Sequence, residues 1–353
     1  MTAAAPRDVE YRALMELSAA LGADPLRTQA AGGNTSIKLD GVMWIKASGK
    51  WLAHAASQDI MTPVLIEPLR QAVANGDSRA ESAVDFIDSS RNSLGLRPSI
   101  ETSVHAVIPS PIVVHIHCVN TIALAVRRDG EKVALGRLEP ISDLDSVFVP
   151  YRKPGLSLAC AISERLTPKT NVLILANHGL IVAGDTVAEV ADRIKKVCEA
   201  FSGPVRQAPE ANLSRLAVLV QDSDYRLPAD SAAHAAALDA TSLAFARRGS
   251  LYPDHVVFLG PGIVEATIVR DRLRVQSDHG RPAPMLVLAD VGVVLHCSAP
   301  GGADAMARCL ADVAARIPED ASVSTLTAAQ ELELVNWEAE TYRQSLGKRA
   351  GAT

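Results

Sequence analysis

The chain has 353 residues, of which 48% are hydrophobic and 21% charged, with a formal net charge of −5 at pH 7. This length predicts more than one domain, and the composition leaves ample material for buried cores. A long basic block and an apolar run long enough to span a bilayer are both missing from the sequence, which argues against nucleic acid or a membrane as partner.

The N-terminal sequence MTAAAPRDVEYRALMELSAALG has no basic start followed by an apolar core, so we do not expect a signal peptide. Five scattered cysteines without a CxxC pair indicate reduced, mostly buried thiols in a cytoplasmic protein.

Hydrophobic periodicity before residue 100 predicts helices over 8–21, 64–75 and 78–94. A β-hairpin is expected between the first two, because Asp40-Gly41 joins SIKL to VMWIKA and is a favoured two-residue turn. The next helix begins at Pro98-Ser99 and ends before Pro109.

The apolar run IVVHIHCVN, residues 112–120, is typical of a buried strand. Beyond it the pattern predicts helices near 119–127, 155–165 and 186–202, and short strands around 133–138 and 146–149. The stretch NVLILANHGLIVAGD predicts two strands broken at Asn177-His178-Gly179. A segment rich in Pro, Ser, Ala and Gly follows at 202–214 and is the best candidate for a linker.

A second α/β unit is expected after the linker. Its predicted helices cover 231–247, 301–316 and 323–345, and its predicted strands cover 254–258, 263–269, 285–289 and 291–296. We therefore expect a domain at 1–205, a linker at 206–214 and a second, smaller α/β domain of unassigned role at 215–353. Irregular alternation of strands, hairpins and helices favours a mixed or antiparallel sheet flanked by helices over a doubly wound parallel one.

Two histidines lie one residue apart in the 112–120 run. Side chains at i and i+2 of a strand share a face, so His115 and His117 point the same way, about 6–7 Å apart along the strand. Such a pair either binds one metal ion or forms a hydrogen-bonded polar patch. His178, at a strand break beside Gly179, is the best third ligand, and catalytic zinc usually has three protein ligands and an open position. The other six histidines are isolated from ligand-like residues: His54, His105, His234, His255, His279 and His296.

Glu101 comes shortly before the histidine strand. Beside a divalent ion it can serve as general base or acid if a partly apolar site raises its pKa; otherwise it is a first-turn helix glutamate favoured by the helix dipole. His105 lies four residues further on and either orients that carboxylate or packs.

Two turns rich in small residues, AGGNTSIKL and KASGKWL, can either hold an anion or serve simply as turns. Neither matches GxGxxG or GxxxxGK[ST], so dinucleotide and P-loop sites are not supported. In the second unit, YPDHVVFLGPG brings together Asp254 and His255, which indicates either a second site or, the interpretation we favour, a loop-to-strand junction.

The ordered set GGNTSIKL, IKASGKWL, RPSIETSVHA, VVHIHCVN and LILANHGLIVAGD resembles the class II aldolase/adducin family across about the first 205 residues. This resemblance implies a mainly antiparallel central sheet between helices in three layers, and a cyclic homotetramer with active sites between subunits. It implies zinc ligation by His115, His117 and His178, with Mn²⁺ or Co²⁺ as alternatives. It further implies that Glu101 moves the substrate proton and that Tyr151 of a neighbouring subunit protonates the aldehyde. The positions that would bind the substrate phosphate are Gly33, Asn34, Ser48, Gly49 and Ser99.

The family's chemistry would be retro-aldol cleavage of a ketose phosphate or hydroxyketone through a metal-stabilised enediolate. Ile100 departs from the family pattern, which has a second serine there, so phosphate binding is expected to be weaker or replaced, with Lys46 as a compensating cation. Alternatives with the same fold are an epimerase, a dehydratase or decarboxylase of a sugar-acid phosphate, and a metal-free adducin-like binding module. Glu101 favours cleavage, because the epimerase relatives generally lack it, and the three histidines argue against the binding module.

Overall fold

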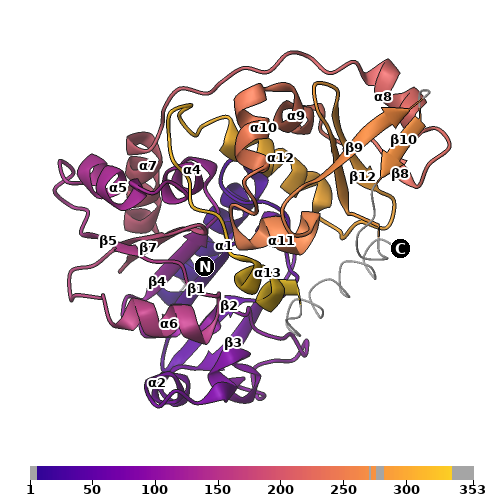
Figure 1. The fold of residues 1–353 in the computed structure, drawn as a ribbon. Coiled ribbons are helices and arrows are strands. Elements are labelled where there is room, and N and C mark those ends of the chain that lie inside the picture. The colour runs from indigo at the N-terminus through magenta and orange to yellow at the C-terminus, as the bar shows by residue number, and fades with distance from the viewer. Residues whose placement is uncertain (1–5, 270–271, 276–281, 336–353) are drawn as a thin grey trace. The chain divides into compact units, whose positions relative to one another are not determined.

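The computed structural model describes residues 6–269, 272–275 and 282–335. The chain divides into two compact units (Figure 1). The first comprises Met1–Thr121 and Gly130–Ser202, and the second comprises Ile122–Asp129 and Gly203–Thr353. Each unit is described by itself below.

A seven-stranded sheet forms the centre of the first unit, in the order β3-β2-β1-β4-β7-β6-β5. Neighbouring strands are antiparallel except for β5 and β6, which are parallel, so the expected mainly antiparallel sheet is confirmed. The strands are β1 (Asn34–Leu39), β2 (Val42–Lys46), β3 (Met61–Leu65), β4 (Ile112–Ile116), β5 (Ser146–Val149), β6 (Val172–Leu175) and β7 (Gly179–Gly184).

Helices cover this sheet. Val113, Leu173 and Ile181 on one face share a buried core with residues of α2, α3 and α6. Alternation along β4 points Val114 and Ile116 the other way, and both are buried. The helices α1 and α7 pack against each other and against strands of the sheet. The helices whose ranges fall wholly or partly in this unit are α1 (Pro6–Ala23), α2 (Ile66–Ala74), α3 (Thr102–Val107), α4 (Val119–Ala125), α5 (Gly130–Leu138), α6 (Leu156–Ser163) and α7 (Val187–Ala200).

Tight turns join β1 to β2 and β6 to β7. Asp40 and Gly41 both have positive φ, 51° and 78°, as a type I′ turn requires, which confirms the predicted hairpin between β1 and β2. The break predicted between the later strands is also a hairpin turn, in which Asn177 takes a φ of 53° between β6 and β7.

Three predicted elements that begin before residue 100 differ in the structure. The helix predicted from Pro98-Ser99 begins only at Thr102. Residues 64 and 65 belong to β3, and only the part from Ile66 onward is helical. The helix predicted over 78–94 is wrong: two short 3-10 helices, η2 (Ser78–Glu81) and η3 (Val84–Phe86), replace it. Ala83 between them has a φ of 54°, a left-handed conformation that ends any α-helix.

The strand predicted over 133–138 is also wrong, because these residues form the second half of α5. Ala134 and Leu138 are both buried and lie four residues apart, which is the spacing of one helix face. Short apolar runs satisfy either periodicity, so only packing decided between helix and strand here.

The second unit contains a mixed five-stranded sheet with the strand order β10-β9-β11-β12-β8. Helix α8 packs against β8 and β10. Its strands are β8 (Tyr225–Arg226), β9 (Val264–Val269), β10 (Arg272–Val275), β11 (Met285–Leu288) and β12 (Gly292–His296). Its helices, with the 3-10 helix η4, are α8 (Leu213–Val220), η4 (Ser231–His234), α9 (Ala235–Leu238), α10 (Ala240–Ala246), α11 (Pro253–Leu259), α12 (Ala303–Ala314) and α13 (Ala328–Val335). β9 and β11 pair parallel, and the other pairings among the described strands are antiparallel.

Three predicted elements of this unit need correction. The strand predicted over 254–258 is the helix α11, for which Pro253 at the first helical position and Asp254 in the first turn are typical start signals. The helix predicted over 231–247 is interrupted at Asp239, whose extended backbone lets its side chain accept a hydrogen bond from Ser242 N and begin α10. The helix predicted over 323–345 is described only as α13, and its part after residue 335 lies outside the described residues, as does His279.

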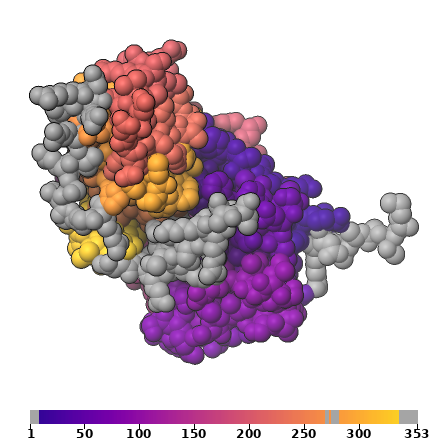
Figure 2. All heavy atoms as spheres, turned by 90° about the vertical axis from the view of Figure 1, so that its right-hand side faces the viewer, coloured from indigo at the N-terminus to yellow at the C-terminus, as the bar shows by residue number. Residues whose placement is uncertain are grey.

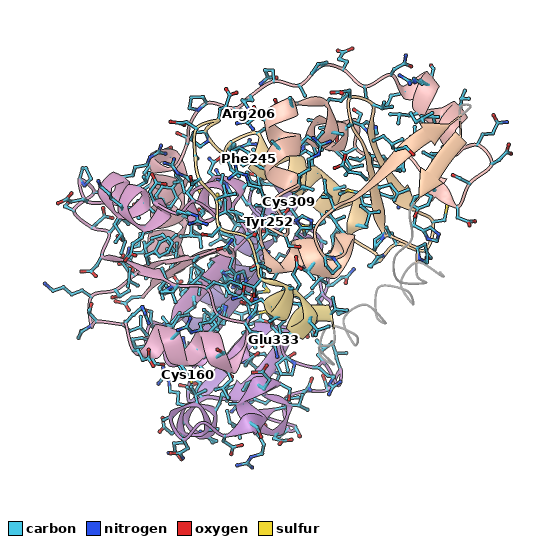
Figure 3. The ribbon with its side chains drawn as sticks, viewed as in Figure 1. Cys160, Arg206, Phe245, Tyr252, Cys309 and Glu333 are labelled. Atoms are coloured by element: carbon cyan, nitrogen blue, oxygen red, sulfur yellow. The ribbon has the colours of Figure 1, made fainter. Side chains whose placement is uncertain are left out.

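The segment predicted as a linker belongs to the second unit, and Arg206 ties it to the rest of that unit. Its guanidinium donates to Asp239 Oδ2 at 2.8 Å, to Ser242 Oγ at 3.1 Å and to Ala314 O at 2.6 Å, and also to Ile317 O. Figure 3 shows Arg206 near Phe245, and the guanidinium carbon lies 5.8 Å from the centre of that ring.

None of the helices in the described part of the chain is long and apolar enough to cross a membrane. In the space-filling view of Figure 2 the first part of the chain, coloured indigo to purple, forms closely packed spheres. Leu14, Met43 and Leu69 lie beneath the surface of this unit and are fully buried.

Candidate metal centre

The histidine pair lies where β4 ends. β4 is held between β1 and β7, and its His115 is directly opposite Asn34 on one side and Ile181 on the other. His117 follows the last residue of the strand, and both imidazoles are buried. Their ring centres are 4.9 Å apart and their Nε2 atoms 3.1 Å apart, so the two side chains turn toward a common point.

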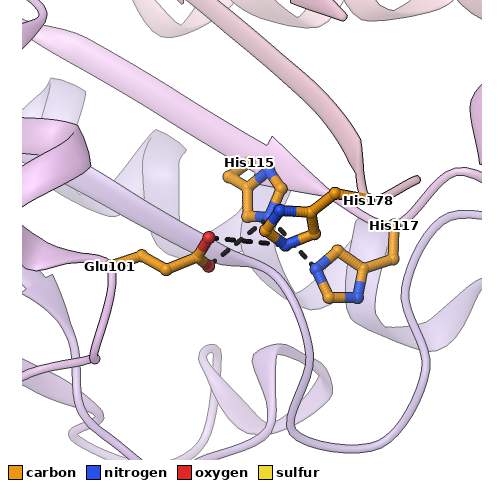
Figure 4. Close-up of side chains that lie close together, drawn as sticks. All are labelled: Glu101, His115, His117 and His178. Atoms are coloured by element: carbon orange, nitrogen blue, oxygen red, sulfur yellow. Dashed lines mark hydrogen bonds and ion pairs between the residues drawn. The ribbon is translucent and has the colours of Figure 1, made fainter. Parts of the chain in front are cut away.

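His178 reaches the same point through the hairpin between β6 and β7. The turn places Gly179 at the start of β7, beside the end of β4, and Gly179 has no room for a side chain because a Cβ would lie 2.6 Å from Ile116 O. The ring of His178 is 4.9 Å from that of His115 and 5.2 Å from that of His117. The structure therefore brings together all three predicted ligands, which are drawn in Figure 4.

Glu101 completes the group from the residue just before α3. Its Oε2 lies 3.4 Å from His115 Nε2, and its Oε1 lies 3.4 Å from His178 Nε2 (Figure 4). The four side chains are all buried, and one ligand atom from each lies within 4.8 Å of the others. Glu101 is the N-cap residue of α3, one residue before the predicted first-turn position.

The donor set fits a divalent ion. Two nitrogens bound to one tetrahedral zinc ion lie about 3.3 Å apart, given Zn–N distances near 2.0–2.1 Å. The 3.1 Å between the Nε2 atoms of His115 and His117 is close to this value. His115 Nδ1 lies 3.1 Å from Leu180 O and donates to it, which fixes the tautomer and leaves the Nε2 lone pair facing the group.

Asn34 holds the carboxylate of Glu101. Its Nδ2 donates to Glu101 Oε2 at 2.9 Å and to Ser99 Oγ at 3.3 Å. Ser99 Oγ in turn accepts a hydrogen bond from the backbone N–H of Glu101 at 3.3 Å. Glu101 Oε1 accepts no hydrogen bond from the described residues, and so it is left to face His178.

The electrostatics of Glu101 differ from the expectation that an apolar site raises its pKa. Burial is the largest influence and does raise it, but in the metal-free protein the positive charges of His115, His178 and His117 in their protonated form and the hydrogen bond from Asn34 together outweigh burial. The pKa of Glu101 is lowered to about 2. The side chain is therefore a carboxylate at neutral pH, the form that accepts a proton.

His105 is not a partner of the Glu101 side chain. Its Nδ1 lies 2.8 Å from Ser36 Oγ, two residues along β1 from Asn34. Asn34 and Ser36 lie two residues apart on one face of β1, and Glu101 and His105 lie four residues apart at the start of the α3 segment. Two neighbouring side-chain hydrogen bonds therefore connect β1 to this segment: Asn34 with Glu101, and Ser36 with His105. Burial above all, together with the charge of His115, lowers the pKa of His105 well below its usual value.

The predicted phosphate positions lie on three connected loops. Gly33 directly precedes β1 and Asn34 is its first residue, Ser48 and Gly49 follow β2, and Ser99 precedes Glu101. Backbone hydrogen bonds from Ser48 N to Arg97 O and from Ser99 N to Lys46 O tie the second loop to the third.

Lys46 joins the first and second of these loops. Its buried ammonium donates to Ala31 O at 2.8 Å and to Lys50 O at 2.7 Å. The cation expected to replace the serine missing at Ile100 is thus engaged in holding backbone carbonyls, and Ile100 itself is half-buried.

Tyr151 lies in the segment between β5 and α6. Glu81 fixes the end of this segment, because its carboxylate accepts from Leu156 N at 2.9 Å and from Lys153 Nζ at 3.1 Å. The role of Tyr151 as a proton donor stays a prediction.

Asp254 and His255, the second candidate pair, belong to the interior of the second unit. His255 is fully buried, and its Nε2 donates to Gly262 O at 2.7 Å. Figure 3 shows Tyr252, from the same segment, close to Cys309. The predicted loop-to-strand junction is the start of a buried helix, and its histidine serves packing and hydrogen bonding.

Two contributions to the site carry no signal in the sequence. The Leu180 carbonyl is a backbone group, which no residue type indicates. Asn34 was predicted only as an anion ligand, because its contact with Glu101 joins residues 67 positions apart.

Comparison with known proteins identifies the family of the chain. Residues 12–202, more than half of the chain, match the Class II Aldolase and Adducin N-terminal domain. The chain belongs to this family.

The chain is also similar to particular relatives. It is 30% identical over 193 residues to an uncharacterized oxidoreductase, YuxG, of Bacillus subtilis (strain 168). That match covers 51% of this chain but only 27% of the relative's length. Among solved structures, the N-terminal class II aldolase domain of a conserved protein from Thermoplasma acidophilum is 25% identical, with a TM-score of 0.48 over 56% of this chain and 95% of its own. L-fuculose-1-phosphate aldolase from Thermus thermophilus is 17% identical, with a TM-score of 0.37 over 55% and 93% of the two chains.

Proposed function

We propose that the protein is a metal-dependent aldolase that cleaves a carbon–carbon bond of a ketose phosphate or a related hydroxyketone. The observation that carries this proposal is the convergence of three buried imidazoles and one buried carboxylate, with ligand atoms within 4.8 Å of one another. His115, His117 and His178 hold the ion, with zinc as the first choice and Mn²⁺ or Co²⁺ as alternatives. A divalent ion there supplies a Lewis acid that stabilises negative charge on substrate oxygens during cleavage.

Glu101 carries the proton in this proposal. As a carboxylate it accepts a proton in the aldol direction and, once protonated, donates it to the substrate carbon in the cleavage direction. Asn34 and Ser99 keep the carboxylate directed at the imidazoles, so the proton is held at a defined position. Tyr151 of a neighbouring subunit is the proposed donor to the aldehyde oxygen, and this requires a cyclic homotetramer.

The loops that carry Gly33, Asn34, Ser48, Gly49 and Ser99 are proposed to bind the acidic group of the substrate. Ile100 removes one hydroxyl from this set, so we expect a smaller preference for phosphate than a second serine would give. We also propose that residues 1–205 form the catalytic domain, 206–214 a linker and 215–353 an accessory domain, and that the protein acts in the cytoplasm.

A screen of ketose 1-phosphates and their unphosphorylated forms tests the proposal. We expect cleavage when metal is bound and none after treatment with a strong chelator. In Glu101→Gln the rate of cleavage should fall by at least about a hundredfold while zinc stays bound. Glu67→Gln is the matched control, because that carboxylate is exposed on α2, where it accepts from Gln71 Nε2, and this variant should keep activity. Activity that ignores both the chelator and Glu101→Gln would refute the aldolase assignment.

Epimerase, dehydratase and decarboxylase activities share the metal group and remain the alternatives that the same screen separates by product. The oxidoreductase name of the YuxG relative is not carried over, because the match covers only 27% of that protein. The described strands of the second unit also lack the run of parallel pairings on which dinucleotide folds depend.

A further inference from the structure

Two cysteines of the first unit lie in contact, and one of them directly follows His117 of the candidate metal centre. Cys118 follows His117 in the chain, and Cys198 lies near the end of α7. Their Sγ atoms are 3.7 Å apart although 80 residues separate them in sequence. Both side chains are buried, at 0% and 3% exposure. The contact therefore joins the residue after a metal ligand to a helix that supplies no ligand.

Arg27 contacts the sulfur of Cys118 with its guanidinium group. Its Nη1 donates to Cys118 Sγ at 3.4 Å, and its Nε lies 3.6 Å from Asp24 Oδ2. A guanidinium that donates to sulfur stabilises the negative charge on a cysteine as it acts as a nucleophile. The Arg27 side chain is 27% exposed, so a partly solvent-exposed guanidinium contacts the buried sulfur of Cys118. The other three cysteines lie elsewhere: Cys160 on α6, and Cys297 and Cys309 in the second unit.

We propose that Cys118 and Cys198 form a redox-active dithiol that closes to a disulfide with a hydroperoxide and thereby weakens metal binding at His117. Cys118 sulfur attacks one peroxide oxygen, the O–O bond breaks, and the sulfur is oxidised to a sulfenic acid while water leaves. Cys198 sulfur then attacks Cys118 sulfur, the S–S bond forms, and hydroxide leaves with the Cys198 proton as a second water. Two thiols and one hydrogen peroxide thus give one disulfide and two waters.

The link to the metal follows from the distance that closure requires. A disulfide bond is about 2.05 Å long, so the two sulfurs must approach by roughly 1.7 Å from their 3.7 Å contact. The N-terminus of α7 is fixed by a capping box between Thr186 and Glu189, and Val190, Ile194 and Val197 bury its inner face. We therefore assign most of the movement to Cys118 and its neighbour His117. Metal sites tolerate ligand shifts of only about 0.2 Å, so the oxidised form should bind zinc at least about tenfold more weakly.

This inference rests on the proposed metal centre for its consequence, but disulfide formation is measurable without metal or substrate. The reduced full-length protein is treated with hydrogen peroxide, alkylated, digested and searched by mass spectrometry for a linked Cys118–Cys198 peptide. Zinc affinity is measured before and after oxidation by competition with a chelator. We expect the linked peptide, a tenfold or greater loss of zinc affinity, and reversal of both changes with dithiothreitol.

Matched variants separate the steps. Cys198→Ser should give no linked peptide and a zinc affinity that peroxide leaves unchanged, whereas Cys309→Ser, a buried control in the second unit, should behave as the parent. Arg27→Gln should slow disulfide formation about tenfold, and a thermal melt of each variant confirms that it is folded.

Survival of both thiols while exposed Cys297 is oxidised would overturn the inference. A disulfide with unaltered zinc affinity would overturn its link to the metal. Failure of the aldolase proposal alone would leave the linked peptide and the zinc loss in place, so the two failures are distinguishable.

Discussion

Gly179→Ala is the substitution whose effect on the metal centre follows most directly from the structure. A Cβ at this position would lie 2.6 Å from Ile116 O, 3.2 Å from His115 Cε1 and 3.3 Å from His117 Cδ2. The first contact is with backbone, so no side-chain rotation relieves it. Even a tight 3.0 Å separation requires β7 and β4 to part by 3.0 − 2.6 = 0.4 Å, at the point where both imidazole carbons are also crowded.

The magnitude of this effect has two components. Overpacking of a buried site costs about 1–3 kcal/mol of unfolding free energy. A shift of 0.4 Å exceeds the roughly 0.2 Å tolerance of metal–ligand distances, and disturbance of groups around a metal site typically lowers affinity about 10–100-fold. At a fixed zinc concentration well above the dissociation constant, the stabilisation by zinc should therefore shrink by about 1.4–2.8 kcal/mol.

The assay is a chelator-competition titration together with thermal unfolding in the presence and absence of zinc. Gly136→Ala is the matched control, because Gly136 lies in α5 of the same unit and its Cβ would meet nothing within 4 Å. We expect this control to gain up to about 1 kcal/mol of stability from helix propensity and to bind zinc as the parent does. Parental zinc affinity in Gly179→Ala would refute the reasoning, and so would an equal loss in Gly136→Ala.

Three further predictions concern single contacts. Asn34→Ala removes the donor that lies 2.9 Å from Glu101 Oε2, so kcat should fall about 10–100-fold with a less than about threefold change in zinc affinity; equal losses of both would show that Asn34 serves the metal and not the carboxylate. Burial lowers the pKa of His255 from 6.5 to about 4, against the smaller effect of its bond to Gly262, so the unfolded chain binds a proton that the folded chain refuses. The contribution of His255 to the unfolding free energy should thus fall by about 1.4 kcal/mol per pH unit from pH 6.5 down to 4, about 3 kcal/mol in all, and denaturant titrations of His255→Gln should show a pH dependence that is smaller by this amount. Arg206→Ala removes one donor to Asp239 and the guanidinium bonds to Ser242 and Ala314, and should cost about 2 kcal/mol or more, measured as a lower midpoint of unfolding. Arg215→Ala on α8 should change little.

Sequence alone determined those features that depend on neighbours along the chain. Asp40-Gly41 predicted a turn because few residue pairs adopt two positive φ angles readily, and both residues do so. The i, i+2 spacing of His115 and His117 predicted a shared direction because side chains alternate along a strand, and their Nε2 atoms meet. Gly179 after His178 predicted a close approach of chains, and no Cβ fits there.

Tertiary structure decided whatever depends on residues far apart in sequence. The runs at 133–138 and 254–258 are too short for periodicity to separate helix from strand, and only their packing made them helices. Asn34 meets Glu101 across 67 residues, and Cys118 meets Cys198 across 80. Neither pair has a local signature, because each contact arises from the order in which strands and helices assemble around the sheet. The residue types of the candidate metal site could thus be predicted from the sequence. The ionised state of its carboxylate and the contact between the two cysteines depend on the tertiary structure.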